Sequence, residues 1–145
     1  MDRELREPMN SLLTNWLSLT QMQMGITSKL EAALQELHQL PLNEFYLLLF
    51  LSEAPEKKLK LQQLEDMVGL SQSAVSRLVS RFEAKGCGAL QRTICEEDRR
   101  AVYTSITPIG EAKLEKALPT FQAVLAEEFS GAKFQNLLQQ IMKGN

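Results

Sequence analysis

Two short amphipathic segments joined by a tight connection are the feature that most constrains how this chain can fold. In "LKLQQLEDMVGL", residues 59–70, apolar side chains recur at helical spacing until Gly69, which suits a helix C-terminus. Ser71 can then cap a second helix that ends at Gly86. This pattern predicts a helix-turn-helix. The residues expected on its buried faces are Leu61, Leu64, Met67 and Val68 in the first helix and Ala74, Val75, Leu78, Val79 and Phe82 in the second.

The periodicity changes from helical to alternating after the second helix. "ALQRTIC" and "AVYTSIT" each alternate between two faces, and the five ionised residues "EEDRR" at 96–100 lie between them. These stretches predict a β-hairpin, or wing, with a charged tip. Thr107 and Pro108 then suit the N-cap and first position of a helix that continues to Phe129, which Pro119 is expected to kink or break.

Helical periodicity also extends to both ends of the chain. Apolar spacing from Pro8 to Leu40 predicts a long first helix, with Gly25 the expected site of a bend. Pro41 suits the first turn of a second helix that ends before Pro55. The fold is therefore expected to be mainly α with a small β wing, in a single domain. Its expected parts are a winged helix-turn-helix lobe at 42–107 and a helical dimerisation lobe at 8–40 and 108–143.

Charge and composition narrow the classes of function. Residues 56–107 hold nine Lys/Arg against seven Asp/Glu, whereas the remainder holds seven against eleven, so the middle is basic relative to both ends. This asymmetry is compatible with a nucleic-acid partner. The longest apolar run is far too short to span a bilayer, which predicts a cytoplasmic protein with no membrane partner. With two cysteines and one histidine, we expect no metal, no cofactor and no enzyme activity.

The second helix of the helix-turn-helix carries short or fork-shaped donors near its N-terminus, where recognition helices meet base edges. Arg77 is expected at a base edge and Arg81, one turn later, at a phosphate. A merely solvated polar face is the alternative. The expected DNA-binding residues of this helix are Ser71, Gln72, Ser73, Ser76, Arg77 and Arg81.

The charged tip of the wing suits the minor groove, whose negative potential attracts arginine. We expect Arg100 to enter this groove, Asp98 to restrict the rotamers of Arg100 by a charge-assisted hydrogen bond, and Arg99 to meet a phosphate. An exposed salt bridge of little consequence is the alternative reading of the Asp98 and Arg100 pair.

Excess apolar surface on both terminal segments, residues 9–37 and 109–142, predicts a homodimer, and a single larger monomeric core is the alternative. Two recognition helices would then read half-sites roughly 34 Å apart. Trp16 and His38 could line an effector pocket, or could simply pack. Cys87 and Cys95 are expected to be inert, with a redox-sensing thiol the alternative.

The chain resembles the MarR family of bacterial transcription regulators. The resemblance lies in "LQQLEDMVGLSQSAVSRLVSRFEAKG" and "EEDRRAVYTSITPIGEAKL", where Asp98, Arg100, Ile106 and Thr107 occupy the positions of the family's wing motif. It implies a dimeric, sequence-specific repressor of a pseudo-palindromic double-stranded DNA operator, released by a small aromatic molecule or a redox signal. "CG" at 87–88 departs from the family pattern as an apparent two-residue insertion before the wing. A winged helix that binds protein, such as an antirepressor, is the rival function.

Overall fold

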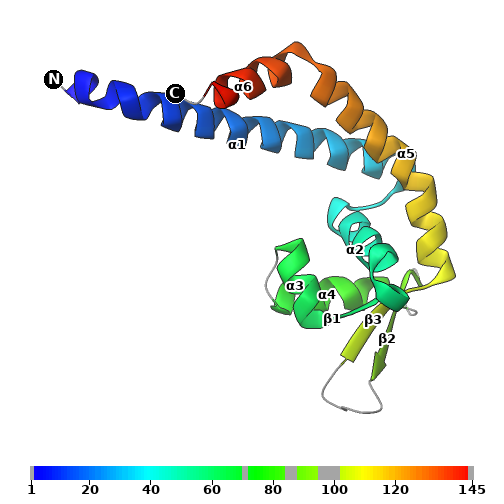
Figure 1. Ribbon diagram of the computed structural model, residues 1–145. Coiled ribbons are helices and arrows are strands. Elements are labelled where there is room, and N and C mark those ends of the chain that lie inside the picture. Colours follow the sequence, from blue (N-terminus) through cyan, green and yellow to red (C-terminus); the bar gives the residue numbers. More distant parts are fainter. Residues whose placement is uncertain (1, 70–71, 84–87, 95–101, 144–145) are drawn as a thin grey trace. The chain divides into compact units, whose positions relative to one another are not determined.

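The computed structural model describes residues 2–69, 72–83, 88–94 and 102–143, with side chains from Ser11 onward except at Gln72 (Figure 1). Its contacts divide the chain into two compact units: Met1–Ala33 with Thr120–Asn145, and Leu34–Pro119. The unit boundaries therefore fall inside helices rather than at helix ends. The elements are α1 (Asp2–His38), α2 (Leu42–Glu53), a 3-10 turn η1 (Pro55–Lys57), β1 (Lys58–Lys60), α3 (Leu61–Val68), α4 (Gln72–Phe82), β2 (Leu90–Ile94), β3 (Val102–Ile106), α5 (Pro108–Ser130) and α6 (Ala132–Met142).

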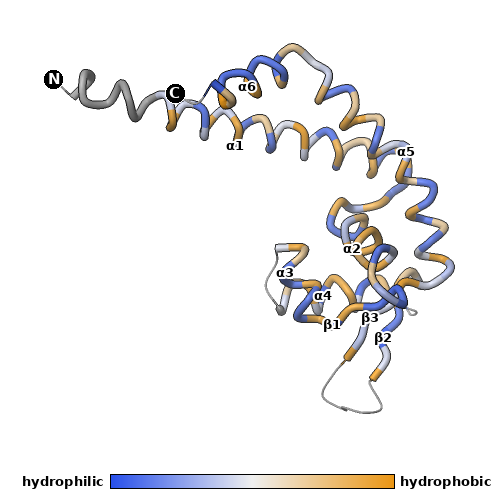
Figure 2. Tube along the Cα trace, in the orientation of Figure 1, coloured by the Kyte–Doolittle hydropathy of each residue, from blue (hydrophilic) through white to orange (hydrophobic). Residues whose placement is uncertain are grey.

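Helix α2 forms the centre of the second unit. Phe45, Leu47, Leu48 and Leu51 are fully buried, which explains why most residues of this helix are apolar (Figure 2). The helix ends before Pro55, as predicted, but Pro41 is the N-cap residue rather than part of the first turn. Glu44 is also buried, and its carboxylate lies 3.7 Å from the Lys113 ammonium of α5.

The predicted helix-turn-helix is present, although α4 ends at Phe82 rather than at the predicted Gly86. Gly69 follows α3 with a left-handed backbone (φ 77°), which a side chain would disfavour. Leu64 is fully buried, but Met67 is 47% exposed, so the predicted buried face of α3 is wrong at that residue. Since α3 has only about two turns, fewer of its apolar residues are buried than the helical spacing predicted.

Three antiparallel strands form the wing sheet, in the order β1, β3, β2. The predicted hairpin is confirmed: Leu90 pairs with Ile106, and Ile94 pairs with Val102. Strand β1 was not predicted, because three residues reading "KLK" carry too little alternation to show in the sequence. Leu59 of β1 and Thr104 of β3 form a buried pair.

The start of α5 follows the predicted cap. The Thr107 hydroxyl oxygen accepts a hydrogen bond from the Gly110 N–H at 3.1 Å, and Pro108 is the first helical residue. Helix α5 nevertheless continues through Pro119, so of the predicted kink or break, the break is wrong. Proline removes one backbone hydrogen bond, and the buried Leu114 and Ala117 anchor the preceding turns. The predicted long first helix is confirmed, since α1 is continuous through Gly25.

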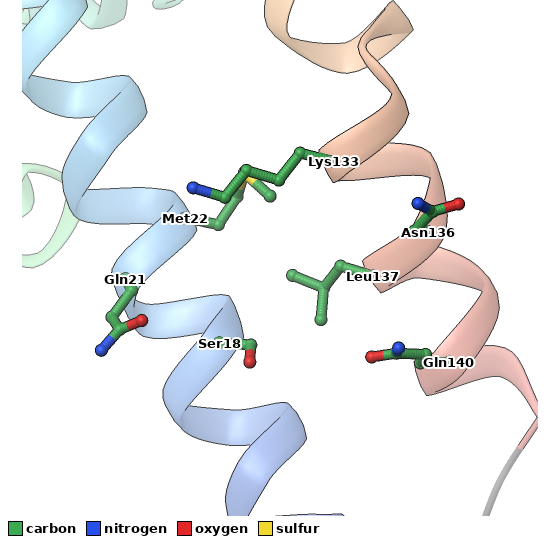
Figure 3. Close-up of a pocket in the computed structure, with 7 residues that line it drawn as sticks. All are labelled: Ser18, Gln21, Met22, Lys133, Asn136, Leu137 and Gln140. Atoms are coloured by element: carbon green, nitrogen blue, oxygen red, sulfur yellow. The ribbon is translucent and has the colours of Figure 1, made fainter.

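In the first unit, α1 packs against the end of α5 and against α6. Lys29 of α1 forms an ion pair with Glu128 at 2.9 Å, and the rings of Phe129 and Phe134 lie 4.8 Å apart across the junction of α5 and α6. Between α1 and α6, Leu137 points into a hollow of about 230 Å³ with a polar rim (Figure 3). The residues lining it are Ser18, Gln21, Met22, Lys133, Asn136, Leu137 and Gln140.

Both terminal helices carry large apolar side chains on their surface. Many of these are exposed by half or more, and they lie in α1 and α6 of the first unit. Among the helices that the structure describes, none has the length and apolar character needed to cross a bilayer. Within the first unit, the large exposed apolar residues of α1 and α6 are Leu12, Leu13, Trp16, Leu17, Leu19, Met24, Leu138, Ile141 and Met142.

Candidate nucleic-acid interface

Helix α4 has one buried face and one polar face. Val75, Val79 and Phe82 recur at positions i, i+4 and i+7 and are buried, which fixes the rotation of the helix about its axis. Ser73, Arg77 and Arg81 are exposed on the opposite side, and Ser76 is half-buried at the margin. The structure therefore turns Ser73, Arg77 and Arg81 away from the core.

The two arginines of α4 are available for an anionic partner. None of the ion pairs within the described ranges involves Arg77 or Arg81. Binding of a phosphate by either guanidinium would therefore break no ion pair among those residues. Because they lie four residues apart, both project from the same side of the helix, one turn from each other.

The structure describes the two strands of the predicted hairpin but not the residues between them. Ile94 and Val102 form the last pair of the hairpin, and residues 95–101 connect them. The predicted minor-groove residues Asp98, Arg99 and Arg100 lie in this connection, outside the described residues. The predicted cap Ser71 is also outside them, as are Cys87 and Cys95, while Gln72 is described only as backbone in the first turn of α4.

Arg92 is a candidate site residue that the sequence did not reveal. The alternation in "ALQRTIC" predicts only that Arg92 shares a strand face with Leu90 and Ile94. In the structure its guanidinium reaches α4, where Nη2 donates to the Ser76 carbonyl oxygen at 2.9 Å and to Ser80 Oγ at 2.6 Å. Its Nε lies 2.9 Å from Glu83 Oε1. The available signal was a charged residue on the strand face that also carries buried Leu90.

The edge of the wing sheet is cationic. Lys58 and Lys60 of β1 place their ammonium groups 4.9 and 5.8 Å from the centre of the Tyr103 ring. Both distances are within the range of cation–π attraction. Lysines on an exposed edge strand also discourage pairing with another chain, so this feature has a structural explanation independent of DNA.

The two predicted effector-pocket residues lie in different units. His38 lines a pocket of about 280 Å³ together with Leu37, Leu40, Lys113 and Lys116. Trp16 does not line this pocket and is 63% exposed on α1. In the described part of the chain, no group of three or more His, Cys, Asp or Glu side chains could hold a metal ion.

Comparison with known proteins gives a match to one family model. The sequence model of the MarR family matches residues 38–101, the segment from the end of α1 to the wing. No curated protein matches the sequence.

Three solved structures share the fold. Sco3205, a MarR family transcriptional regulator from Streptomyces coelicolor solved in complex with DNA, has a TM-score of 0.74 and 24% identity, over 88% of this chain and 81% of that one. A mutant MarR from E. coli complexed with operator DNA has a TM-score of 0.73 and 19% identity, over 92% and 94%. BpsR from Bordetella bronchiseptica has a TM-score of 0.65 and 20% identity, over 86% and 96%. The MarR family model therefore matches the winged helix-turn-helix core of this chain, and these MarR structures share its fold.

Proposed function

We propose that this protein is a cytoplasmic, dimeric repressor that binds a pseudo-palindromic operator through α4 and the wing. The observation that carries the proposal is the polar face of α4, where Arg77 and Arg81 are exposed. Buried Val75 and Val79 on the other face fix the rotation of the helix about its axis. An α-helix of this kind fits the major groove, which is about 12 Å wide. DNA complexes of Sco3205 and MarR, which share the fold, support the same partner.

The two arginines have separable roles in this proposal. Arg77 lies closer to the N-terminus of α4, where it would meet a base edge, and Arg81 would meet a phosphate. A base contact specifies sequence, whereas a phosphate contact contributes equally to every duplex. The pair therefore offers a matched comparison within one helix.

Replacing Arg77 with alanine is expected to weaken binding to a duplex from the protein's own promoter region by roughly 5- to 150-fold and to relax sequence preference. Arg81→Ala should weaken binding to all duplexes by a similar factor and reduce the salt slope by about one. Arg100→Ala, in the predicted wing tip, should also lower affinity without dissociating the dimer. Fluorescence anisotropy with promoter and scrambled duplexes measures these effects. Wild-type affinity in all three variants would refute the assignment of the site.

Salt dependence separates DNA binding from the rival function, a winged helix that binds protein. Release of counterions makes the logarithm of the DNA-binding constant fall steeply with the logarithm of salt concentration. A protein interface responds weakly by comparison. If the wild-type protein shows no steep salt response on any duplex, the antirepressor reading replaces the proposal.

The pocket around His38 supports release by a small anionic effector. Lys113 and Lys116 bring two ammonium groups to an otherwise partly apolar pocket, and such a combination suits an aromatic carboxylate. Lys113 also faces buried Glu44, which leaves Lys116 as the better partner for a ligand. BpsR, which shares the fold, is regulated in its DNA binding by 6-hydroxynicotinic acid.

Lys116→Gln is expected to raise the concentration of 6-hydroxynicotinic acid needed to release DNA by about 10-fold, through loss of one charge-assisted hydrogen bond. Lys133→Gln is the matched control, because that lysine lines the separate hollow between α1 and α6. Release curves followed by anisotropy provide the measurement. Equal curves for both variants would remove this pocket from the mechanism.

A further inference from the structure

The guanidinium of Arg92 holds one strand of the wing to two groups on α4 and to the residue that directly follows this helix. Its acceptors are the Ser76 carbonyl oxygen, the Ser80 hydroxyl and the Glu83 carboxylate. Ser76 and Ser80 lie one turn apart on α4, and Glu83 follows its last residue, so the contacts gather at the C-terminal end of the helix. Because the guanidinium is planar and its donors have fixed directions, three contacts of this kind restrict both the position and the tilt of the strand.

Electrostatics favour the same arrangement. Glu83 directly follows the C-terminal end of α4, where the helix dipole makes a carboxylate unfavourable. Arg92 places a cation there, which offsets both the dipole and the carboxylate. Both side chains keep about a third of their surface exposed, so the pair is accessible to solvent but fixed by the additional bonds to Ser76 and Ser80.

Arg92 lies close to the end of β2, so its contacts link the end of this strand to α4. It lies two residues before Ile94, the last paired residue of β2, after which the chain enters the predicted DNA-binding tip. The helix that it holds carries Arg77 and Arg81. We infer that Arg92 is a positioning residue that joins the wing and the recognition helix into one rigid DNA-reading unit. This inference rests on the proposed function.

A direct contact between Arg92 and a phosphate would also make the residue important, and Glu83→Gln separates the two cases. If Arg92 acts through the helix, this substitution removes its anchor and should weaken DNA binding by roughly 5- to 10-fold. If Arg92 contacts phosphate itself, removal of a nearby negative charge should leave affinity unchanged or strengthen it. The sign of the change therefore distinguishes positioning from contact.

The experiment compares Glu83→Gln, Arg92→Lys, Arg92→Ala and the double variant Glu83→Gln/Arg92→Ala by anisotropy on the promoter duplex. Gln91→Ala, on the exposed neighbouring position of β2, is the control. We expect Arg92→Lys to restore only part of the affinity lost in Arg92→Ala, because an ammonium lacks the planar fork. The double variant should bind no more weakly than Arg92→Ala alone. Tighter binding by Glu83→Gln, or additive losses, would overturn the inference.

A measurement without DNA separates failure of this inference from failure of the proposed function. In wild-type protein the Nε–H of Arg92 should exchange slowly with solvent in ¹H–¹⁵N spectra, and Glu83→Gln should accelerate that exchange at least about 10-fold. If the wild-type protein binds no duplex but Arg92 exchange responds as expected, the link between Arg92 and α4 is supported and the DNA-binding proposal fails. Unchanged exchange in Glu83→Gln would show that Glu83 does not hold Arg92 and would overturn the inference itself.

Discussion

Gly110→Ala is expected to destabilise the protein by about 3 kcal/mol or more, because the site has no room for a methyl group. A Cβ at this position would lie 2.3 Å from the Ala89 carbonyl oxygen, 2.8 Å from Ile106 Cγ1 and 3.1 Å from Leu48 Cδ2. The first of these is a backbone atom in a buried residue, so it cannot rotate away. Either α5 or the chain entering β2 would have to move.

Hydrogen bonds around Gly110 explain why such a movement is costly. The Ala89 carbonyl oxygen that would clash also accepts the Thr107 N–H at 3.0 Å. The Thr107 hydroxyl donates to the Gly88 carbonyl oxygen at 2.5 Å and accepts from the Gly110 N–H. Displacing the helix would therefore strain the N-cap of α5 and the entry to the wing together.

Thermal and urea unfolding provide the measurement, with an expected fall in Tm of roughly 6 °C or more. Gly25→Ala is the matched control, since it is also a helical glycine and a Cβ there would meet nothing within 4 Å. That substitution should stabilise α1 by about 0.5 to 1 kcal/mol through its effect on backbone entropy. Equal stability of Gly110→Ala and the wild-type protein would show that the close approach is absent in solution.

This contact also shows what the sequence could and could not reveal. The Thr107 cap and Pro108 start of α5 were predicted because their chemistry is local. The close approach of Ala89 to Gly110 joins residues 21 positions apart, and no periodicity encodes it. The mainly α fold, the helix-turn-helix and the wing hairpin were likewise accessible from local spacing.

The errors in the prediction share the same cause. Arg92 has its partners 9 to 16 residues away, so alternation assigned its face but not its role. Strand β1 exists because it pairs with distant β3, and its own three residues say little. Continuity of α5 through Pro119 depends on packing that propensity does not include. The assigned DNA contacts of α4 and the wing tip remain predictions.

The second large effect concerns the apolar surface of the terminal helices. Leu12, Trp16 and Leu19 recur at i, i+4 and i+7 on α1, so they share one side of the helix, and each is exposed. On α6, Leu138, Ile141 and Met142 recur at i, i+3 and i+4 and are also exposed. Two such stripes in one unit form a larger apolar surface than scattered single residues would. A second copy of the chain would cover them in the proposed dimer.

Trp16→Glu is expected to weaken dimerisation by about 30-fold or more, because it replaces a large anchor with a charge that the interface would have to desolvate. The side chain is 63% exposed in the single chain, so the substitution should leave the fold of each subunit intact. Thr14→Glu is the matched control, since it adds the same charge on the opposite side of α1. Sedimentation equilibrium measures the monomer–dimer constant for both variants.

DNA binding then tests whether the dimer is the functional unit. A dimer binds a pseudo-palindrome with its second recognition helix at high effective concentration, an advantage of about 100-fold or more over a single subunit. Trp16→Glu should therefore lose most of its affinity for the full operator while binding a single half-site as well as the wild-type protein does. If the variant stayed dimeric, the apolar stripe on α1 would lie outside the interface. If it became monomeric yet kept full-operator affinity, one subunit would suffice to read the site, and paired recognition helices would have no part in it.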